Sequence, residues 1–368
     1  MPAIDLRSDT VTQPTPAMRA AMMAAQLGDD VLGDDSAVTA LEVKIATLLG
    51  KEAGLFVPSG TMANQLAIRC HCEGGDEIIA HGESHIIHYE TGAPAAISGC
   101  MIRPLDGPRG LFDAASLTAA VRNRDIHSPY SRLLVVENTH NRGGGSVWPL
   151  AQFREVSAAA REYQLAVHID GARLFNACAT AGYSPHEFVA SADTVSVCFS
   201  KGLGAPVGSA LVGPQPLIDR ARRFRKMLGG GMRQSGFLAA AAIYALDHHV
   251  ERLSQDHTRA RALAQRISTI AGLTVNPPLA QIESNMVFFD VAQHLGDART
   301  FCARLHSHAV QMIPMGARRV RAVMHLDVPE DVVERATAAL VSTTAALVST
   351  TAALVSTTAA DATSKAAT

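Results

Sequence analysis

The sequence predicts an α/β protein with a mostly parallel sheet covered by helices, followed by a smaller α+β domain. Between residues 54 and 213, short apolar runs alternate with helical patterns, as in crossover connections between parallel strands. The runs are almost continuously apolar, which is typical of strands buried on both faces. Beyond residue 216 the chain becomes mainly helical, and only two further apolar runs occur.

The expected elements follow this rhythm in order along the chain. Two amphipathic helices precede the sheet, at 15–26 and 36–50, and Ser36 is an N-cap residue type for the second. The strands of the large domain are expected at 54–57, 77–80, 133–136, 166–169, 194–199 and 210–212. Its helices are expected at 61–72, 113–124, 151–163 and 184–190. The later elements are helices at 217–228, 233–271 and 297–309 and strands at 286–291 and 320–326.

We divide the chain into four parts: an N-terminal segment 1–27, a large domain 28–245, a small C-terminal domain 246–340 and a tail 341–368. The end of the chain carries AALVSTT three times in succession from residue 338. A seven-residue period would keep Leu340, Leu347 and Leu354 near one face of a helix. A low-complexity tail without catalytic role is the simpler interpretation, with its first copy completing a helix that opens after Pro329.

Composition excludes several classes of protein. Only 18% of the 368 residues are charged and the net charge is −2, so neither nucleic acid nor a membrane surface is an expected partner. The longest apolar run has ten residues, whereas a membrane-spanning helix needs about 20. The first residues lack the features of a secretory leader, and six dispersed cysteines form no disulfide framework. These features predict a cytoplasmic protein.

Metal binding is not expected. Cys70, His71 and Cys72 are adjacent in sequence but lie on one helical pattern with no matching second cluster. A zinc site needs four ligands at suitable spacing. We therefore assign these three side chains to packing.

Lys201 is the best placed of the five lysines, which are Lys44, Lys51, Lys201, Lys226 and Lys365. It follows the apolar run 195–199 and precedes a glycine-containing turn, which places it at the end of a buried strand. Scarce water there favours the neutral amine, the form that attacks a carbonyl carbon to make a Schiff base. The residue alone leaves open the alternative of an exposed loop lysine.

Asp170 ends a second apolar run, 165–169, and parallel strands would bring it to the same sheet edge as Lys201. A carboxylate there can pair with a protonated pyridine nitrogen, although Asp170 could equally cap the next helix. At a third point, Ser59, Gly60 and Thr61 join an apolar run to a helix, where backbone N–H groups can bind a phosphate. An ordinary turn with Thr61 as N-cap is the alternative there.

A phosphate loop, a strand-end aspartate and a lysine about thirty residues later resemble the core of the pyridoxal phosphate (PLP) enzymes of fold type I. The surrounding blocks resemble the L-threonine aldolases from residue 4 to residue 327, which is nearly the whole chain except the repeat tail. The matching blocks are 4–12, 28–31, 58–64, 137–141, 168–173, 200–208, 229–234 and 321–327. The resemblance implies a large domain with a seven-stranded, mostly parallel sheet between helices.

The resemblance also implies a role for individual residues. Lys201 would carry PLP, Asp170 would pair with its ring nitrogen, and Gly60 and Thr61 would bind its phosphate. Lys226 and Arg233 match positions that approach this phosphate from a neighbouring subunit, which implies a homo-oligomer, a dimer at least and a tetramer as the expected form. Ser8, Arg173 and Arg321 match residues that hold the substrate carboxylate, with Arg173 also near the cofactor, although ordinary salt bridges are the commoner use of arginine.

Two histidines complete the expected site. His85 matches the histidine that stacks on the cofactor ring, and His140 matches one near the substrate hydroxyl; which of them acts as base stays open. The implied reaction is reversible cleavage of L-threonine, L-allo-threonine and related β-hydroxy-α-amino acids to glycine and an aldehyde, in threonine breakdown and glycine formation. The alternatives are another PLP lyase or transaminase reaction, or a non-catalytic scaffold, against which retention of Lys201, Asp170 and the arginines argues. Leu32 stands where many relatives of the L-threonine aldolase family carry an aromatic residue, so the preference among threonine, allo-threonine and phenylserine stays open.

Overall fold

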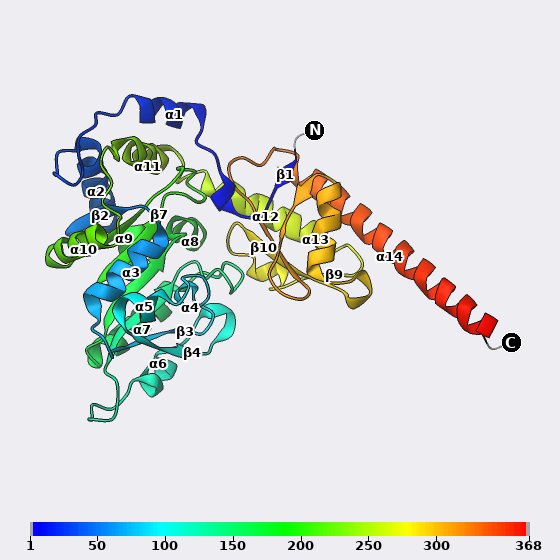
Figure 1. Cartoon of the computed structure of the whole chain (residues 1–368), viewed down its shortest axis with the longest axis horizontal. Coiled ribbons are helices and arrows are strands. Elements are labelled where there is room, and N and C mark those ends of the chain that lie inside the picture. The colour runs from blue at the N-terminus through cyan, green and yellow to red at the C-terminus, as the bar shows by residue number, and fades with distance from the viewer. Residues whose placement is uncertain (1–2, 366–368) are drawn as a thin grey trace. The chain divides into compact units, whose positions relative to one another are not determined.

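A computed structural model describes residues 3–365, with side chains as far as residue 348 (Figure 1). The chain divides into two compact units, one of residues 12–254 and one that joins residues 1–11 to residues 255–368. The sequence-based division at residues 27 and 245 differs from this. Residues 3–11 belong to the second unit because β1 (Ile4–Asp5) pairs in parallel with β11 (Val310–Gln311), a contact that local sequence cannot show.

The larger unit contains a seven-stranded sheet in the order β2-β8-β7-β6-β5-β3-β4. All pairings are parallel except those of β8, which is antiparallel to both of its neighbours. This confirms the predicted fold class. The strands are β2 (Ala53–Val57), β3 (Glu77–His81), β4 (Met101–Leu105), β5 (Ser131–Glu137), β6 (Ala166–Gly171), β7 (Thr194–Cys198) and β8 (Ser209–Gly213).

The sequence pattern did not predict β4. Most of its residues are at least partly exposed, so it has no continuous apolar run, and it contains Pro104. A proline is tolerated at a sheet edge because its missing N–H can face away from the ladder. The edge position of β4 therefore explains why its sequence does not look like that of the buried strands.

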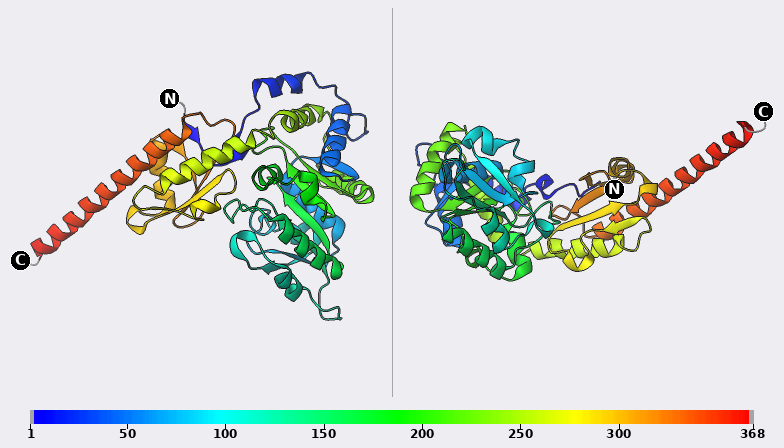
Figure 2. Two further views of the ribbon diagram at one scale, coloured as in Figure 1. Left: turned by 180° about the vertical axis from the view of Figure 1, so that it is seen from behind. Right: turned by 90° about the horizontal axis from the view of Figure 1, so that it is seen from below.

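Helices cover both faces of this sheet, as Figure 2 shows for the larger unit. Alternate residues of β5 enter different apolar clusters: Leu134 and Val136 join one, and Leu133 and Val135 join the other. The helices are α1 (Pro16–Met23), α2 (Ser36–Leu49), α3 (Gly60–His71), α4 (His85–His88), α5 (Ala93–Ser98), α6 (Ala114–Ala120), α7 (Leu150–Glu162), α8 (Leu174–Ala181), α9 (Pro185–Val189), α10 (Gln215–Met227) and α11 (Gly236–His248). The sheet is therefore buried on both sides, as the continuous apolar runs predicted.

Two predicted details of the helices were wrong. Asp35, rather than Ser36, caps α2 and accepts a hydrogen bond from the Val38 amide. The long helix expected over 233–271 is two helices, α11 and α12 (Leu253–Ile267), separated by a turn at 249–252. Both differences concern helix ends, where periodicity alone carries little information.

The second unit contains a four-stranded antiparallel sheet in the order β12-β13-β10-β9. Its strands are β9 (Leu273–Val275), β10 (Met286–Val291), β12 (Ile313–Pro314) and β13 (Arg319–Val323). Its helices include α13 (Ala298–Ser307) and the long α14 (Val332–Lys365), the red helix of Figure 1. One apolar core joins the sheet to α12, α13 and the first part of α14.

Helix α14 runs through the repeats instead of ending at the first copy. Leu340 and Leu347 are buried in the core of this unit, and Thr343 and Thr344 are buried beside them. The side chain of Leu354 lies outside the described part of the chain. The boundary expected at residue 340 therefore crosses a packed helix, because the second repeat still contributes an apolar side chain to the core.

Among the described residues, no helix combines the length and apolar character needed to cross a membrane.

Candidate active site

The carboxyl ends of β5, β6 and β7 bring the expected polar residues together. Glu137 of β5 is the register partner of Asp170 in β6, and Asp170 is the partner of Ser196 in β7. Lys201 follows β7 by three residues and is partly buried. The parallel register thus places the predicted aspartate and lysine at one edge of the sheet.

Asp170 is a buried carboxylate with several partners. It accepts hydrogen bonds from Asn64 Nδ2 at 2.8 Å and from the Ala172 amide at 3.1 Å. Burial by itself raises the pKa of Asp170, but the charges of His85 and Lys201 and the hydrogen bond from Asn64 hold it below its ordinary value. Asp170 is therefore an anion in a dry environment, and such an anion needs a cation or strong donors beside it.

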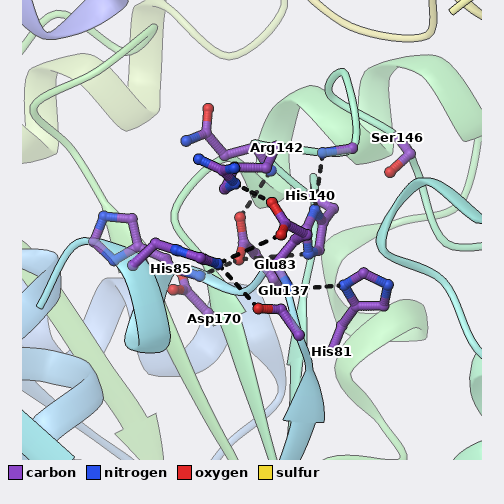
Figure 3. A network of polar contacts seen from close by, with 12 residues as sticks. His81, Glu83, His85, Glu137, His140, Arg142, Ser146 and Asp170 are labelled. Carbon is purple, nitrogen blue, oxygen red and sulfur yellow. Dashed lines mark hydrogen bonds and ion pairs between the residues drawn. The ribbon is translucent and has the colours of Figure 1, made fainter. Parts of the chain in front are cut away.

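His85 stands at the start of α4, next to this carboxylate (Figure 3). Its Nδ1 lies 2.8 Å from Glu90 Oε1, and its backbone amide donates to Glu137 Oε2 at 2.7 Å. Burial lowers the pKa of His85, but the hydrogen bond to Glu90 and the charges of Asp170, Glu90 and Glu137 raise it above the ordinary value overall. Since Glu90 accepts the Nδ1 proton, the neutral imidazole carries its lone pair on Nε2.

His140 is more deeply buried and has the opposite donor pattern. The Gly143 amide donates to its Nδ1 at 3.0 Å, so the neutral ring carries its proton on Nε2. That Nε2 is buried without a hydrogen-bond partner among the described residues and lies 3.9 Å from Glu137 Oε2. Burial lowers the pKa of His140. Neutral His140 is therefore a hydrogen-bond donor at Nε2 and not a proton acceptor there.

The ring of His140 is held in place from two sides. The ring of His81 meets it edge-on, with 5.1 Å between centroids. Gly110, at φ +85°, lies so close that a Cβ there would come within 2.1 Å of the His140 ring. A glycine is needed at this position both for its left-handed backbone and for this close approach.

The N-terminus of α3 forms the expected anion-binding end of the site. Ser59 caps the helix by accepting from the Met62 amide at 3.2 Å, so Thr61 is not the N-cap that the alternative interpretation required. The amides of Gly60 and Thr61 have no acceptor within the described residues. Free amides at the start of a twelve-residue helix are a favourable place for a phosphate.

The remaining predicted residues are distributed over both units. Arg173 is buried two residues after the end of β6. Lys226 on α10 and Arg233 after it are exposed, and Arg233 pairs with Asp29 at 2.8 Å. Ser8 and Arg321 belong to the second unit, in which Arg321 Nη2 donates to the Arg7 carbonyl at 3.0 Å. The structure thus joins Lys201, Asp170, His85 and His140 within one unit.

Sequence reasoning missed Glu90 and assigned no role to Asn64. Glu90 follows a four-residue helix and has no pattern around it, yet its carboxylate is buried and accepts from Asn64, Gln65 and His85. Asn64 lay inside a block that carried the resemblance, and its place near the start of the helix after the phosphate loop was the available signal.

The cysteine-rich segment packs in the interior. Cys70 and Cys72 are buried, and His71 Nε2 lies 2.9 Å from Thr194 Oγ1. One group of potential metal ligands occurs among the described residues, namely His85, Glu90 and Asp170, whose ligand atoms lie within 4.8 Å of one another. These atoms already bind one another directly or through Asn64, which accounts for their proximity.

Known proteins resemble this chain over most of its length. A low-specificity L-threonine aldolase of Escherichia coli K12 is 42% identical, over 91% of this chain and 97% of its own. Low-specificity L-threonine aldolase 1 of Arabidopsis thaliana is 42% identical, over 88% of this chain and 92% of its own. The solved threonine aldolase of Leishmania major, 22% identical, shares the fold with a TM-score of 0.79 and covers 93% of this chain and 99% of its own.

Residues 5–292 match the beta-eliminating lyase family. This match includes every predicted site residue except Arg321. Together with the 42% identity to two threonine aldolases, it confirms the resemblance that the motifs indicated. The chain therefore belongs to the beta-eliminating lyase family and, within it, to the low-specificity L-threonine aldolases.

Proposed function

We propose that this protein is a PLP-dependent aldolase that cleaves L-threonine, L-allo-threonine and related β-hydroxy-α-amino acids reversibly to glycine and an aldehyde. The observation that carries the proposal is the buried, ionised Asp170 beside His85 and Lys201 at the carboxyl edge of the sheet. Family membership supports the choice of substrate, since relatives of 42% identity are named for this activity.

The residues present fit PLP. Asp170 offers a buried anion for the ring nitrogen, Lys201 an amine for the aldehyde, and the free amides of Gly60 and Thr61 a phosphate site. The charge of His85 acts on the same carboxylate, and this histidine would cover the ring. Bound PLP supplies a sink for the electron pair that is released when the Cα–Cβ bond breaks.

Arg173 would hold the carboxylate of the substrate, and the resemblance names Ser8 and Arg321 of the second unit as further candidates for this role. Guanidinium groups recognise a carboxylate with two parallel hydrogen bonds, which fixes the rotation of the amino acid as well as its position. Such fixation selects which bond to Cα is aligned for cleavage. The contribution of these residues is therefore orientation.

We assign the two histidines different roles, because their neutral rings carry the proton on different nitrogen atoms. His85 Nε2 carries the lone pair in the neutral ring, so it accepts the proton of the β-hydroxyl. His140 Nε2 carries a proton, so it donates a hydrogen bond and positions the hydroxyl oxygen. The hydrogen bonds that each ring makes through Nδ1 support this division of roles.

The proposal includes an assembly and a cellular role. Lys226 and Arg233 are exposed in the single chain, which suits residues that complete the phosphate site of a neighbouring subunit. We propose a homodimer as the minimum unit and a tetramer as the working form. The cytoplasmic breakdown of threonine to glycine is the corresponding role.

A β-elimination on the same scaffold is the second candidate, because the family that matches residues 5–292 is described by that reaction. Incubation with L-threonine and L-allo-threonine separates the two. Acetaldehyde and glycine in equal amounts are the expected products, whereas 2-oxobutanoate and ammonia would establish elimination. Lys201→Ala is the control, since it removes the amine that either reaction needs.

A further inference from the structure

A chain of hydrogen bonds between buried side chains reaches Asp170 through the amide of Asn64. It links Asn64 and His71 of α3, His168 of β6, and Thr194 and Ser196 of β7. Four of the five side chains are fully buried, and His71 is partly buried. Buried polar groups of this kind require defined partners, so the direction of each hydrogen bond can be worked out.

The amide of Asn64 has one orientation. Its Nδ2 lies 2.8 Å from Asp170 Oδ2 and 2.8 Å from Glu90 Oε1. Ionised carboxylates only accept hydrogen bonds, so the NH₂ group must face them. The Oδ1 atom then accepts from Ser196 Oγ at 2.7 Å and from His168 Nε2 at 3.1 Å.

The histidines follow from this orientation. Because His168 donates from Nε2, its neutral ring accepts at Nδ1, and Thr194 Oγ1 donates to it at 3.0 Å. Thr194 has a single hydroxyl proton, so it accepts from His71 Nε2 at 2.9 Å. Burial lowers the pKa of His168 to about 3 and that of His71 to about 4, which keeps both rings neutral. Every donor in the chain then points toward Asp170.

We propose that His168 and Thr194 are positioning residues, which fix the Asn64 amide with one N–H on Asp170 and the other on Glu90, and thereby keep Asp170 an anion toward the cofactor ring. This inference rests on the proposed function and deepens it. Asn64 binds both carboxylates, so its orientation acts on Asp170 and on the partner of His85 together.

The consequence for the cofactor is a question of where one proton lies. Asp170 is faced by His85 from α4, Lys201 after β7 and Asn64 from α3. Glu137 at the end of β5, His140 after it and His168 of β6 itself also lie near this carboxylate. One proton would be shared between the ring nitrogen of the cofactor and the carboxylate of Asp170. Without the N–H of Asn64, the carboxylate would hold this proton more strongly, and the ring nitrogen would lose it. A neutral ring is a weaker electron acceptor, so turnover falls while substrate binding changes little.

The test compares His168→Leu, which removes the donor to Asn64, with His168→Gln, whose side-chain NH₂ can replace it. Thr194→Val removes only the hydroxyl that donates to Nδ1 of His168 and so fixes the tautomer of that ring. It keeps the test valid if the His168→Leu variant does not fold. Ser157→Ala is the matched control, because Ser157 is a buried hydroxyl on α7 outside the chain of hydrogen bonds. Each protein is loaded with PLP labelled with ¹⁵N at the ring nitrogen, and the nitrogen chemical shift is followed against pH together with kcat and KM.

We expect the ring nitrogen to stay protonated in the unmodified protein and in Ser157→Ala. In His168→Leu and Thr194→Val it should lose its proton at lower pH, with kcat down about 10–100-fold, the range known for outer partners of metal-ligating groups, and KM little changed. His168→Gln should recover most of the loss. Unchanged nitrogen shifts in both defective variants, or a glutamine variant no better than leucine, would overturn the inference.

Failure of the proposed function gives a different result. If the unmodified protein does not attach PLP at Lys201, the proposed function fails before any variant is compared. If it attaches PLP and cleaves threonine while all variants behave like Ser157→Ala, only the positioning inference fails.

Discussion

At the scale of single residues, the site depends on which atom of each side chain carries a proton. The charges of Lys201 and His85 lower the pKa of Asp170, and the charge of Asp170 in turn raises the pKa of His85. Two predictions follow from these atoms, one for the amine and one for the imidazole.

Lys201→Ala should abolish covalent attachment of PLP, because no other lysine follows a strand of the sheet at this edge. Borohydride reduction of the loaded, unmodified protein should fix the cofactor on the peptide that contains Lys201. Peptide mass spectrometry checks this, with Lys226 as the internal comparison. Recovery of the label on Lys226 would contradict the assignment.

Cleavage should weaken as the pH falls through the pKa of His85. The pKa of His85 is raised above its ordinary value of 6.5 by Glu90 and the neighbouring carboxylates, so the ring stays protonated to a higher pH. Only the neutral ring accepts a proton, and the acid limb of kcat/KM therefore lies above the ordinary histidine value. Glu90→Gln removes the nearest negative charge and should move this limb to lower pH.

His85→Asn tests the same role directly. It should lower kcat by about 10²–10⁴-fold, the usual contribution of a positioned base, and should remove the acid limb. His140→Asn keeps a side-chain donor and should keep the limb. If His140→Asn loses the limb while His85→Asn retains it, the two roles are exchanged.

At the scale of elements, the start of α3 is set by how closely it approaches β7. A Cβ on Gly60 would lie 2.7 Å from Cys198 Sγ, so one of the two must shift, and we expect Gly60→Ala to displace the first turn of the helix and the amides of the phosphate site. PLP affinity should fall, as measured by titrating the cofactor-free protein. Gly74→Ala is the control, because a Cβ there meets nothing within 4 Å.

A second substitution makes this prediction sharper. Cys198→Ala removes the sulfur atom that the new methyl group would meet, so the double variant should regain much of the affinity. Equal affinity in Gly60→Ala and the unmodified protein would show that the phosphate does not depend on the position of this helix.

In helix α14, two neighbouring residues of a repeat differ in burial and should therefore differ in their contribution to stability. Leu340 is fully buried, whereas Val341 is 49% exposed. Leu340→Ala should destabilise the protein by about 2–5 kcal/mol, and Val341→Ala should stay within about 0.5 kcal/mol. Urea unfolding measures both, and similar losses would show that the repeats do not pack against the core.

At the scale of the whole molecule, we propose that a complete active site combines residues of two copies of the chain. If Lys226 and Arg233 serve a neighbour's phosphate site, an inactive Lys201→Ala subunit and an inactive Lys226→Ala/Arg233→Ala subunit should restore one intact site when combined. Co-expression with different affinity tags isolates the mixed dimer for assay. Absence of any recovered activity, or a fully active monomer in sedimentation, would contradict the shared site.

The alternation of apolar runs and helical patterns was enough to predict the parallel sheet, because strands buried on both faces have a composition that loops and helices do not share. Asp170 and Lys201 were found for a related reason, since each follows such a strand and parallel strands end at a common edge. The edge strand β4 and the end of α11 were not predicted, because exposure and helix ends leave little trace in the sequence.

By itself, then, the sequence determined the fold class, the family and the residues at the strand ends, because these depend on burial patterns and motifs written locally in the chain. Only the tertiary structure decided that Glu90 and Asn64 join His85 to Asp170, and that His85 and His140 carry their protons on opposite nitrogens. Asn64 and Asp170 are 106 residues apart in the chain. A proton's position depends on the donors and charges that folding brings within hydrogen-bonding distance, and no local pattern records those neighbours.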